Sequence, residues 1–308
     1  MISRRNIRVK VMQTLYAVET MEGETKPGEP QKILQRYFDQ TRALLVYLVY
    51  TLTEVARYAE TSARNRASKH LPTEEDLKVN TKVAGNELLW KILEDASYQL
   101  ALKEVKPQLL ADSELIKKLY LKLAETPEYH EYIAVLGRDG KSERKLLEFI
   151  FSTLMLPNED YTSHVEELFT NWDDDCEMME QLVLNYLQKP GSFNFMEILS
   201  KEKGTFAKDL LLSVLDKKEV TMDMIKPKLK NWDADRIAVL DMILMEMGVC
   251  EFLYFETIPP KVTINEYIDL AKEYSTPQSG QFINGILDNI HKELLKDEKM
   301  HKVAFKKK

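Results

Sequence analysis

Apolar residues recur at the 3.6-residue spacing of helices along most of this 308-residue chain. The first such stripe follows Ser3, a candidate N-cap, and runs to about Met21; a longer one covers residues 31–66. No segment alternates as a half-buried strand would, and ten glycines and eleven prolines are few for a turn-rich fold. The chain is therefore predicted to be all-α. Further helices are expected at residues 86–102, 113–125, 128–136, 143–154, 161–169, 176–187, 195–200, 205–215, 222–230, 233–252, 263–274 and 281–295.

Composition narrows the class of protein. The chain is 44% hydrophobic and 30% charged, which is typical of a globular protein and not of a disordered one. The strongest apolar run, residues 44–50, is too short to span a bilayer, and the N-terminus does not resemble a signal peptide. Cys176 and Cys250 stand alone, which favours a reducing compartment. A cytoplasmic protein without a membrane partner is expected.

Charge is segregated along the sequence. The net charge of −7 argues against binding nucleic acid by bulk electrostatics. However, the N-terminal helix carries Arg4, Arg5 and Arg8 on the flank of its apolar stripe, and six lysines lie in the tail from Lys296. Residues 146–188 contain ten acids and no lysine or arginine. Basic ends of this kind can hold phosphates while an acidic middle limits non-specific binding.

Two motifs at opposite ends of the chain are more specific. Residues 258–272 read IPPKVTINEYIDLAK, residues 282–288 read FINGILD, and residues 4–16 fit the pattern RRxxRxxxxQxLY. In this order and spacing they resemble the C-terminal signature and the opening of the NusB family of bacterial transcription antitermination factors. The resemblance covers about a third of the chain.

The resemblance implies a fold of two small helical bundles, here with an additional helical insertion after the first helix. The expected division is residues 1–20 as the first helix of the N-terminal bundle, 21–199 as the insertion, 200–230 as the rest of that bundle, 231–296 as the C-terminal three-helix bundle, and 297–308 as a basic tail. The resemblance also implies a non-enzymatic, RNA-binding protein that promotes rRNA transcription. Family members pair with the ribosomal protein NusE, hold single-stranded boxA leader RNA and act through it on the RNA polymerase elongation complex.

Candidate RNA contacts lie on the first helix and on the C-terminal loop between two helices. Guanidinium forks bind phosphate, and single-stranded RNA is recognised by stacking and by hydrogen bonds to base edges. The arginines are assigned to phosphates, the two aromatic residues at the loop edges to stacking, and the polar loop residues to bases or phosphates. The full candidate set is Arg4, Arg5, Arg8, Gln13, Tyr16, Tyr274, Gln278, Ser279, Gln281 and Phe282. Gln278 and Gln281 stand where family members often carry an acidic and a basic residue.

Other motifs have structural interpretations. Thr263 and Glu266 form a T-x-x-E pattern, interpreted as a capping box, and Gly285 is expected to allow close helix packing. Residues 137–142 end like a phosphate-binding loop but lack its first glycine and its strand, so a turn is expected. The scattered histidines form no metal-ligand pair, and no nucleophile or cofactor motif is present, so no metal, cofactor or catalytic residue is predicted.

Three other hypotheses stay open. The fold could serve as the RNA-binding domain of an rRNA methyltransferase, although the strand-containing catalytic domain of such an enzyme has no counterpart in this sequence. The chain could be an interaction scaffold that does not bind RNA, with the insertion contacting polymerase or ribosome assembly factors. Finally, the acidic residues 146–188 could compete with RNA for the basic ends.

Overall fold

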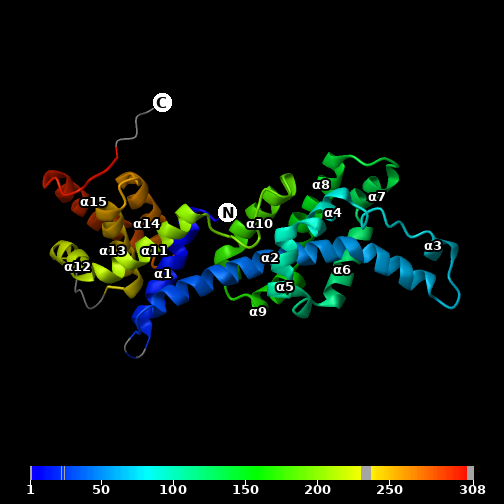
Figure 1. Cartoon of the computed structure of the whole chain (residues 1–308), viewed down its shortest axis with the longest axis horizontal. Coiled ribbons are helices and arrows are strands. Elements are labelled where there is room, and N and C mark those ends of the chain that lie inside the picture. The colour runs from blue at the N-terminus through cyan, green and yellow to red at the C-terminus, as the bar shows by residue number, and fades with distance from the viewer. Residues whose placement is uncertain (1, 22, 24, 230–236, 304–308) are drawn as a thin grey trace. The chain divides into compact units, whose positions relative to one another are not determined.

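The computed structural model describes residues 2–21, 23, 25–229 and 237–303, and within these ranges the regular structure is entirely helical (Figure 1). The all-α prediction is thereby confirmed. The chain forms two compact units, one of residues 38–198 and one of residues 2–37 and 199–308. None of the described helices is long and apolar enough to cross a membrane.

The second unit is built around α13, which packs against the other helices of this unit. Most residues of α13 are buried, because it is apolar on nearly every face. Gly248 lets α13 approach its neighbours closely, since a Cβ there would lie 2.9 Å from the methyl carbons of Leu287 and 3.4 Å from the Tyr267 ring. The helices are α1 (Arg4–Thr20), α11 (Lys201–Asp216), α12 (Lys218–Ile225) with a 3-10 turn (Lys226–Lys228), α13 (Val239–Tyr254), α14 (Pro260–Tyr274) and α15 (Ser279–Lys296).

The first unit contains one extended hydrophobic core, which begins in the long helix α2 and ends near Phe195. The boundary between the units falls inside α2, after Tyr37. Six of the helices that follow have 8 to 12 residues and are each capped by an Asn, Asp or Thr side chain, which explains the many breaks between them. The last helix of the unit is longer, at 17 residues, and has no side-chain cap. The elements from α2 onward are α2 (Glu29–Ala67), α3 (Glu74–Leu77), α4 (Glu87–Glu94), α5 (Ala96–Val105), a 3-10 turn (Pro107–Leu109), α6 (Ser113–Ala124), α7 (Pro127–Ala134), α8 (Gly140–Phe149), a π-helix (Ile150–Met155), α9 (Glu159–Leu168) and α10 (Trp172–Gln188).

Several expected helices differ from those observed. The helix predicted at 86–102 is divided at Asp95, whose side chain accepts hydrogen bonds from two backbone N–H groups and starts α5. The segment 195–200 is not helical. The helix predicted at 233–252 begins at Val239 in the structure, and residues 233–236 lie outside the described ranges.

The capping-box interpretation of Thr263 is wrong. Pro260 occupies the first position of α14, so the helix starts three residues earlier than the motif suggested and Thr263 lies inside it. The expectation for Gly285 is also wrong, because a Cβ at this position would meet nothing within 4 Å. Close packing in this unit depends on Gly248 and on Gly280, where a Cβ would lie 3.0 Å from the Lys272 side chain.

The basic tail begins against the helices of the second unit. The Lys302 ammonium donates hydrogen bonds to the backbone oxygens of Glu251 and Phe255, at 2.8 and 2.7 Å. These two oxygens also accept hydrogen bonds from the backbone N–H groups of Phe255 and Ile258, and a lysine is favoured there by the partial negative charge of the helix end. Burial lowers the pKa of Lys302. Residues 304–308 of the predicted tail lie outside the described ranges.

Candidate nucleic-acid interface

The first turn of α1 exposes two arginine side chains. The Ser3 hydroxyl accepts a hydrogen bond from the Asn6 backbone N–H at 3.2 Å, which confirms the predicted cap. Arg4 and Arg5 follow, each with somewhat more than a third of its side chain exposed. No acidic residue lies in this turn, so both guanidinium groups oppose the partial positive charge of the helix end. Their compensation must come from other elements.

Carboxylates from two other helices supply this compensation. Arg4 Nη2 lies 2.8 Å from Glu202 Oε1 on α11, and Arg5 Nη2 lies 2.7 Å from Glu273 Oε2 on α14. The Arg4 guanidinium also lies 5.4 Å from the centre of the Phe206 ring, a cation–π distance. The end of α1 is therefore held between α11 and α14, with its guanidinium groups at the surface.

Arg8 does not reach the surface, and the expectation that it presents a guanidinium group to a ligand is wrong. Its side chain is only 3% exposed. Nε and Nη2 donate to Glu251 at 2.6 and 3.1 Å, and Nη1 donates to Glu266 at 3.2 Å. Burial opposes the charged form, but the hydrogen bond and the charge of Glu251 outweigh it, and the pKa of Arg8 rises. Arg8 lies on the face of α1 that packs against α13.

Glu251 is the centre of a buried polar network. It is fully buried on α13, and beyond Arg8 it accepts hydrogen bonds from the Thr263 hydroxyl at 3.0 Å and the Tyr267 hydroxyl at 2.8 Å. Burial and the charge of Glu251 raise the pKa of Tyr267 well above its ordinary value, so this hydroxyl remains a donor. The network fixes α1, α13 and α14 relative to one another, and it thereby positions the exposed arginines.

The loop between α14 and α15 is short and internally bonded. Ser279, predicted to contact bases, is buried, and its hydroxyl donates to Asp241 Oδ2 at 2.8 Å while it bonds Thr276 Oγ1 at 2.8 Å. Ser279, the first residue of α15, therefore stabilises the loop through its buried hydroxyl, and its predicted contact with a base stays a prediction. Gln278 and Gln281 are exposed.

The remaining candidates fall into two groups along α1 and the loop. Tyr274 is the last residue of α14 and Phe282 lies in the first turn of α15, and both are half-buried. The ion pair of Arg5 with Glu273, which precedes Tyr274, brings the first turn of α1 to this place. Gln13 is half-buried and Tyr16 is 46% exposed further along α1. Eleven residues separate Arg5 from Tyr16, about 16 Å along the helix axis, so Tyr16 lies away from the arginine pair.

Sequence reasoning missed the carboxylates that organise this site. Glu202 and Glu273 look like ordinary surface residues of helices, and no signal in the sequence pairs them with particular arginines. The sequence did contain a sign of the buried acids. Asp241, Glu246 and Glu251 interrupt a helix that is otherwise apolar, and an acidic side chain in such a helix is buried and requires a hydrogen-bonding or charged partner.

Comparison with known proteins supplies the family. The sequence model of the NusB family matches residues 165–292, a segment that begins in α9 of the first unit and ends in α15. Three curated relatives carry the name transcription antitermination protein NusB. The protein from Finegoldia magna is 42% identical over 94 residues, 30% of this chain and 69% of the relative. That from Methylacidiphilum infernorum is 39% identical over 101 residues, covering 33% and 70%, and that from Bacillus mycoides is 40% identical over 90 residues, covering 29% and 69%. No solved structure matches the chain.

Fold and site define an all-helical protein in which a basic helix end lies beside a polar loop between two helices. The identity and coverage of the relatives then make the assignment specific: this chain belongs to the NusB family of transcription antitermination proteins. The assignment of residues 21–199 to an insertion stays a prediction.

Proposed function

We propose that this protein is a non-enzymatic antitermination factor that binds single-stranded boxA-type leader RNA jointly with the ribosomal protein NusE. Through that RNA it acts on the RNA polymerase elongation complex and promotes rRNA transcription. The observation that carries the proposal is the contact of Arg5 with Glu273, because it brings the first turn of α1, which also carries Arg4, to the residue that precedes the segment of residues 274–282. The names of the relatives support the transcriptional role.

In this proposal the site has a phosphate side and a base side. Arg4 and Arg5 hold phosphates, for which their planar forks are suited. The half-exposed rings at the loop ends stack on bases, and the amides of Gln278 and Gln281 bond base edges or phosphates. Gln13 and Tyr16 extend the RNA path along α1. Arg8 and Ser279 act indirectly, because their bonds fix the helix end and the loop.

The test is binding of a boxA leader RNA, with and without NusE, across a salt series. The wild type is compared with Arg4→Ala/Arg5→Ala; Arg8 is left intact because its loss would disturb folding. The double variant should bind more weakly, and its salt slope should be shallower by about 1.4 log units per log unit of salt, from roughly 0.7 per lost phosphate contact. NusE should strengthen binding by the wild type more than binding by the variant.

A matched control removes two arginines elsewhere. Arg57 and Arg64 are exposed on α2, and Arg57→Ala/Arg64→Ala causes the same change in net charge. If both double variants weakened RNA binding equally, attraction would be non-specific and the proposed site would be wrong. If the wild type showed no preference for boxA over a scrambled RNA with or without NusE, the RNA-binding function would be refuted.

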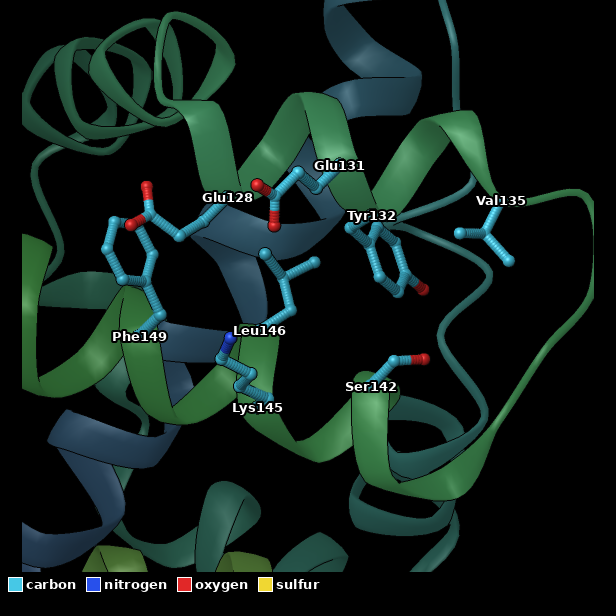
Figure 2. Close-up of a pocket in the computed structure, with 8 residues that line it drawn as sticks. All are labelled: Glu128, Glu131, Tyr132, Val135, Ser142, Lys145, Leu146 and Phe149. Atoms are coloured by element: carbon cyan, nitrogen blue, oxygen red, sulfur yellow. The ribbon is translucent and has the colours of Figure 1, made fainter.

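One observation favours the interaction scaffold as a second candidate function. An apolar pocket of about 210 Å³ lies between α7 and α8 in the first unit (Figure 2). Tyr132 from α7 and Leu146 and Phe149 from α8 form its apolar lining, and Figure 2 shows the carboxylates of Glu128 and Glu131 on the α7 side. This volume is below the usual range of drug-sized ligand pockets and suits one side chain of a protein partner.

The scaffold function predicts a different pattern of loss. Val135 lines the pocket and is 59% exposed, and Leu136 beside it is fully exposed. Val135→Ser/Leu136→Ser should abolish co-sedimentation with RNA polymerase or small ribosomal subunits while leaving RNA affinity unchanged. Leu71→Ser, at an exposed apolar residue outside the pocket lining, is the control. Equal co-sedimentation of wild type and pocket variant would refute this candidate.

A further inference from the structure

The two exposed arginines of α1 are already engaged by carboxylates. Arg4 contacts Glu202 at 2.8 Å and Arg5 contacts Glu273 at 2.7 Å, each through its Nη2 nitrogen. A phosphate oxygen that takes the same N–H group must first displace the carboxylate oxygen, because both are acceptors and need the same position at hydrogen-bond distance. Binding of a phosphate through these nitrogens is therefore an exchange of anions, and binding through the other guanidinium N–H groups brings the phosphate beside the charge of the carboxylate.

The local helix context explains one of these acids and not the other. Glu202 lies in the first turn of α11, where a carboxylate is favoured by the partial positive charge of the helix end. Glu273 is the next-to-last residue of α14, where the partial negative charge disfavours it. The position of Glu273 is thus unfavourable for its own helix, and the contact with Arg5 compensates for this.

Both contacts can be exchanged. The Glu202 side chain is 78% exposed and the Glu273 side chain 49% exposed, so water can replace the arginine around each carboxylate. Each carboxylate takes one nitrogen of its arginine, whereas a phosphate can engage a guanidinium group through two parallel hydrogen bonds. Phosphate therefore displaces the carboxylates, but part of its interaction energy is used in doing so.

We propose that Glu202 and Glu273 are affinity-determining residues of the RNA site, acting as built-in competitors of RNA phosphates for Arg4 and Arg5. This rests on the proposed RNA-binding function and adds two residues to it that do not themselves touch RNA. Neutralising them leaves both guanidinium groups available and removes two negative charges beside the incoming phosphates. Both effects strengthen binding.

The experiment uses the full chain with Glu202→Gln, Glu273→Gln and the double variant. Glutamine keeps the length and shape of the side chain and removes its charge. Affinity for boxA RNA is measured with and without NusE from low to high salt, and thermal unfolding checks that each variant is folded. The double variant should bind about two- to twenty-five-fold more tightly at low salt, from roughly 1.5- to fivefold for each exposed ion pair. The gain should shrink as salt rises, because screening weakens both the ion pairs and the repulsion.

A matched control has the same change in charge. Glu19→Gln/Glu293→Gln breaks two ion pairs between helices, Glu19 with Lys218 at 2.8 Å and Glu293 with Lys228 at 2.6 Å. Glu19 is fifteen residues from Arg4 on α1, about 22 Å along the axis and beyond the screening length at physiological salt. This control should change RNA affinity by less than about 1.5-fold at physiological salt.

The outcomes separate the inference from the function on which it rests. If the wild type binds RNA and the Glu202→Gln/Glu273→Gln variant binds it equally or more weakly, the competitor role is overturned and the proposed RNA site is unaffected. An equal gain in the control also overturns it, because bulk charge would then explain the effect. Absence of RNA binding by wild type and variants alike overturns the proposed function together with the inference.

Discussion

Replacement of Arg8 by methionine tests the buried network most directly. Methionine keeps an unbranched chain of similar reach and removes the charge. In the wild type Arg8 makes two hydrogen bonds to Glu251 and one to Glu266. After the replacement, the fully buried Glu251 carboxylate keeps the Thr263 and Tyr267 hydroxyls but no cation.

The expected cost follows from that isolated charge. Removing one partner of a buried ion pair typically destabilises a protein by about 3–5 kcal/mol. For a unit of roughly 150 residues this is a fall in melting temperature of about 10 °C. The double variant Arg8→Met/Glu251→Gln also removes the uncompensated charge. Its loss of unfolding free energy should therefore be smaller than the sum of the losses in the two single variants, by a coupling energy of about 2 kcal/mol.

Hydrogen exchange is the appropriate assay, because the chain has two units and need not unfold in one step. Peptides from α1, α13 and α14 report the opening free energy of the second unit, and peptides from α10 serve as the internal control. A loss below about 1 kcal/mol in Arg8→Met, together with weaker RNA binding, would show that Arg8 is an exposed ligand contact and that the buried network is wrong.

Three further predictions concern the same unit. Burial raises the pKa of Glu246 to about 7, above the ordinary glutamate value, so the folded state binds this proton more tightly than the unfolded state. The free energy of unfolding should therefore fall by about 2 kcal/mol as pH rises from 4.5 to 7. In Glu246→Gln, denaturation measured as a function of pH should lack this change. Lys302→Ala removes the two hydrogen bonds at the end of α13 and should lower the free energy of unfolding, measured in urea, by about 1 kcal/mol. RNA affinity should stay unchanged, and a lowered affinity would place this lysine in the RNA site. Gly248→Ala should lower the free energy of unfolding by about 1–2 kcal/mol, because the new Cβ would lie 2.9 Å from the Leu287 side chain. Gly285→Ala, where a Cβ meets nothing within 4 Å, should raise it by about 0.5–1 kcal/mol. Equal melting temperatures for the two variants would contradict the observed packing.

The sequence determined the fold class and the family. Helical periodicity is a local property, and residues such as Ser3 cap a helix through contacts three residues away, so these elements could be predicted from neighbours in the chain. The motifs near both ends were enough to indicate the NusB family, and the relatives agree with them. Local pattern also misled: Thr263 matches a capping box, but the preceding Pro260 starts the helix first.

Only the tertiary structure decided which charged residues are available to a ligand. Arg4, Arg5 and Arg8 look alike in the sequence, yet the first two are exposed and the third is buried. The difference arises because Arg8 meets Glu251, which is 243 residues away in the chain. Since no local rule specifies such a partner, the sequence could nominate the arginines but could not divide them into ligand contacts and structural supports.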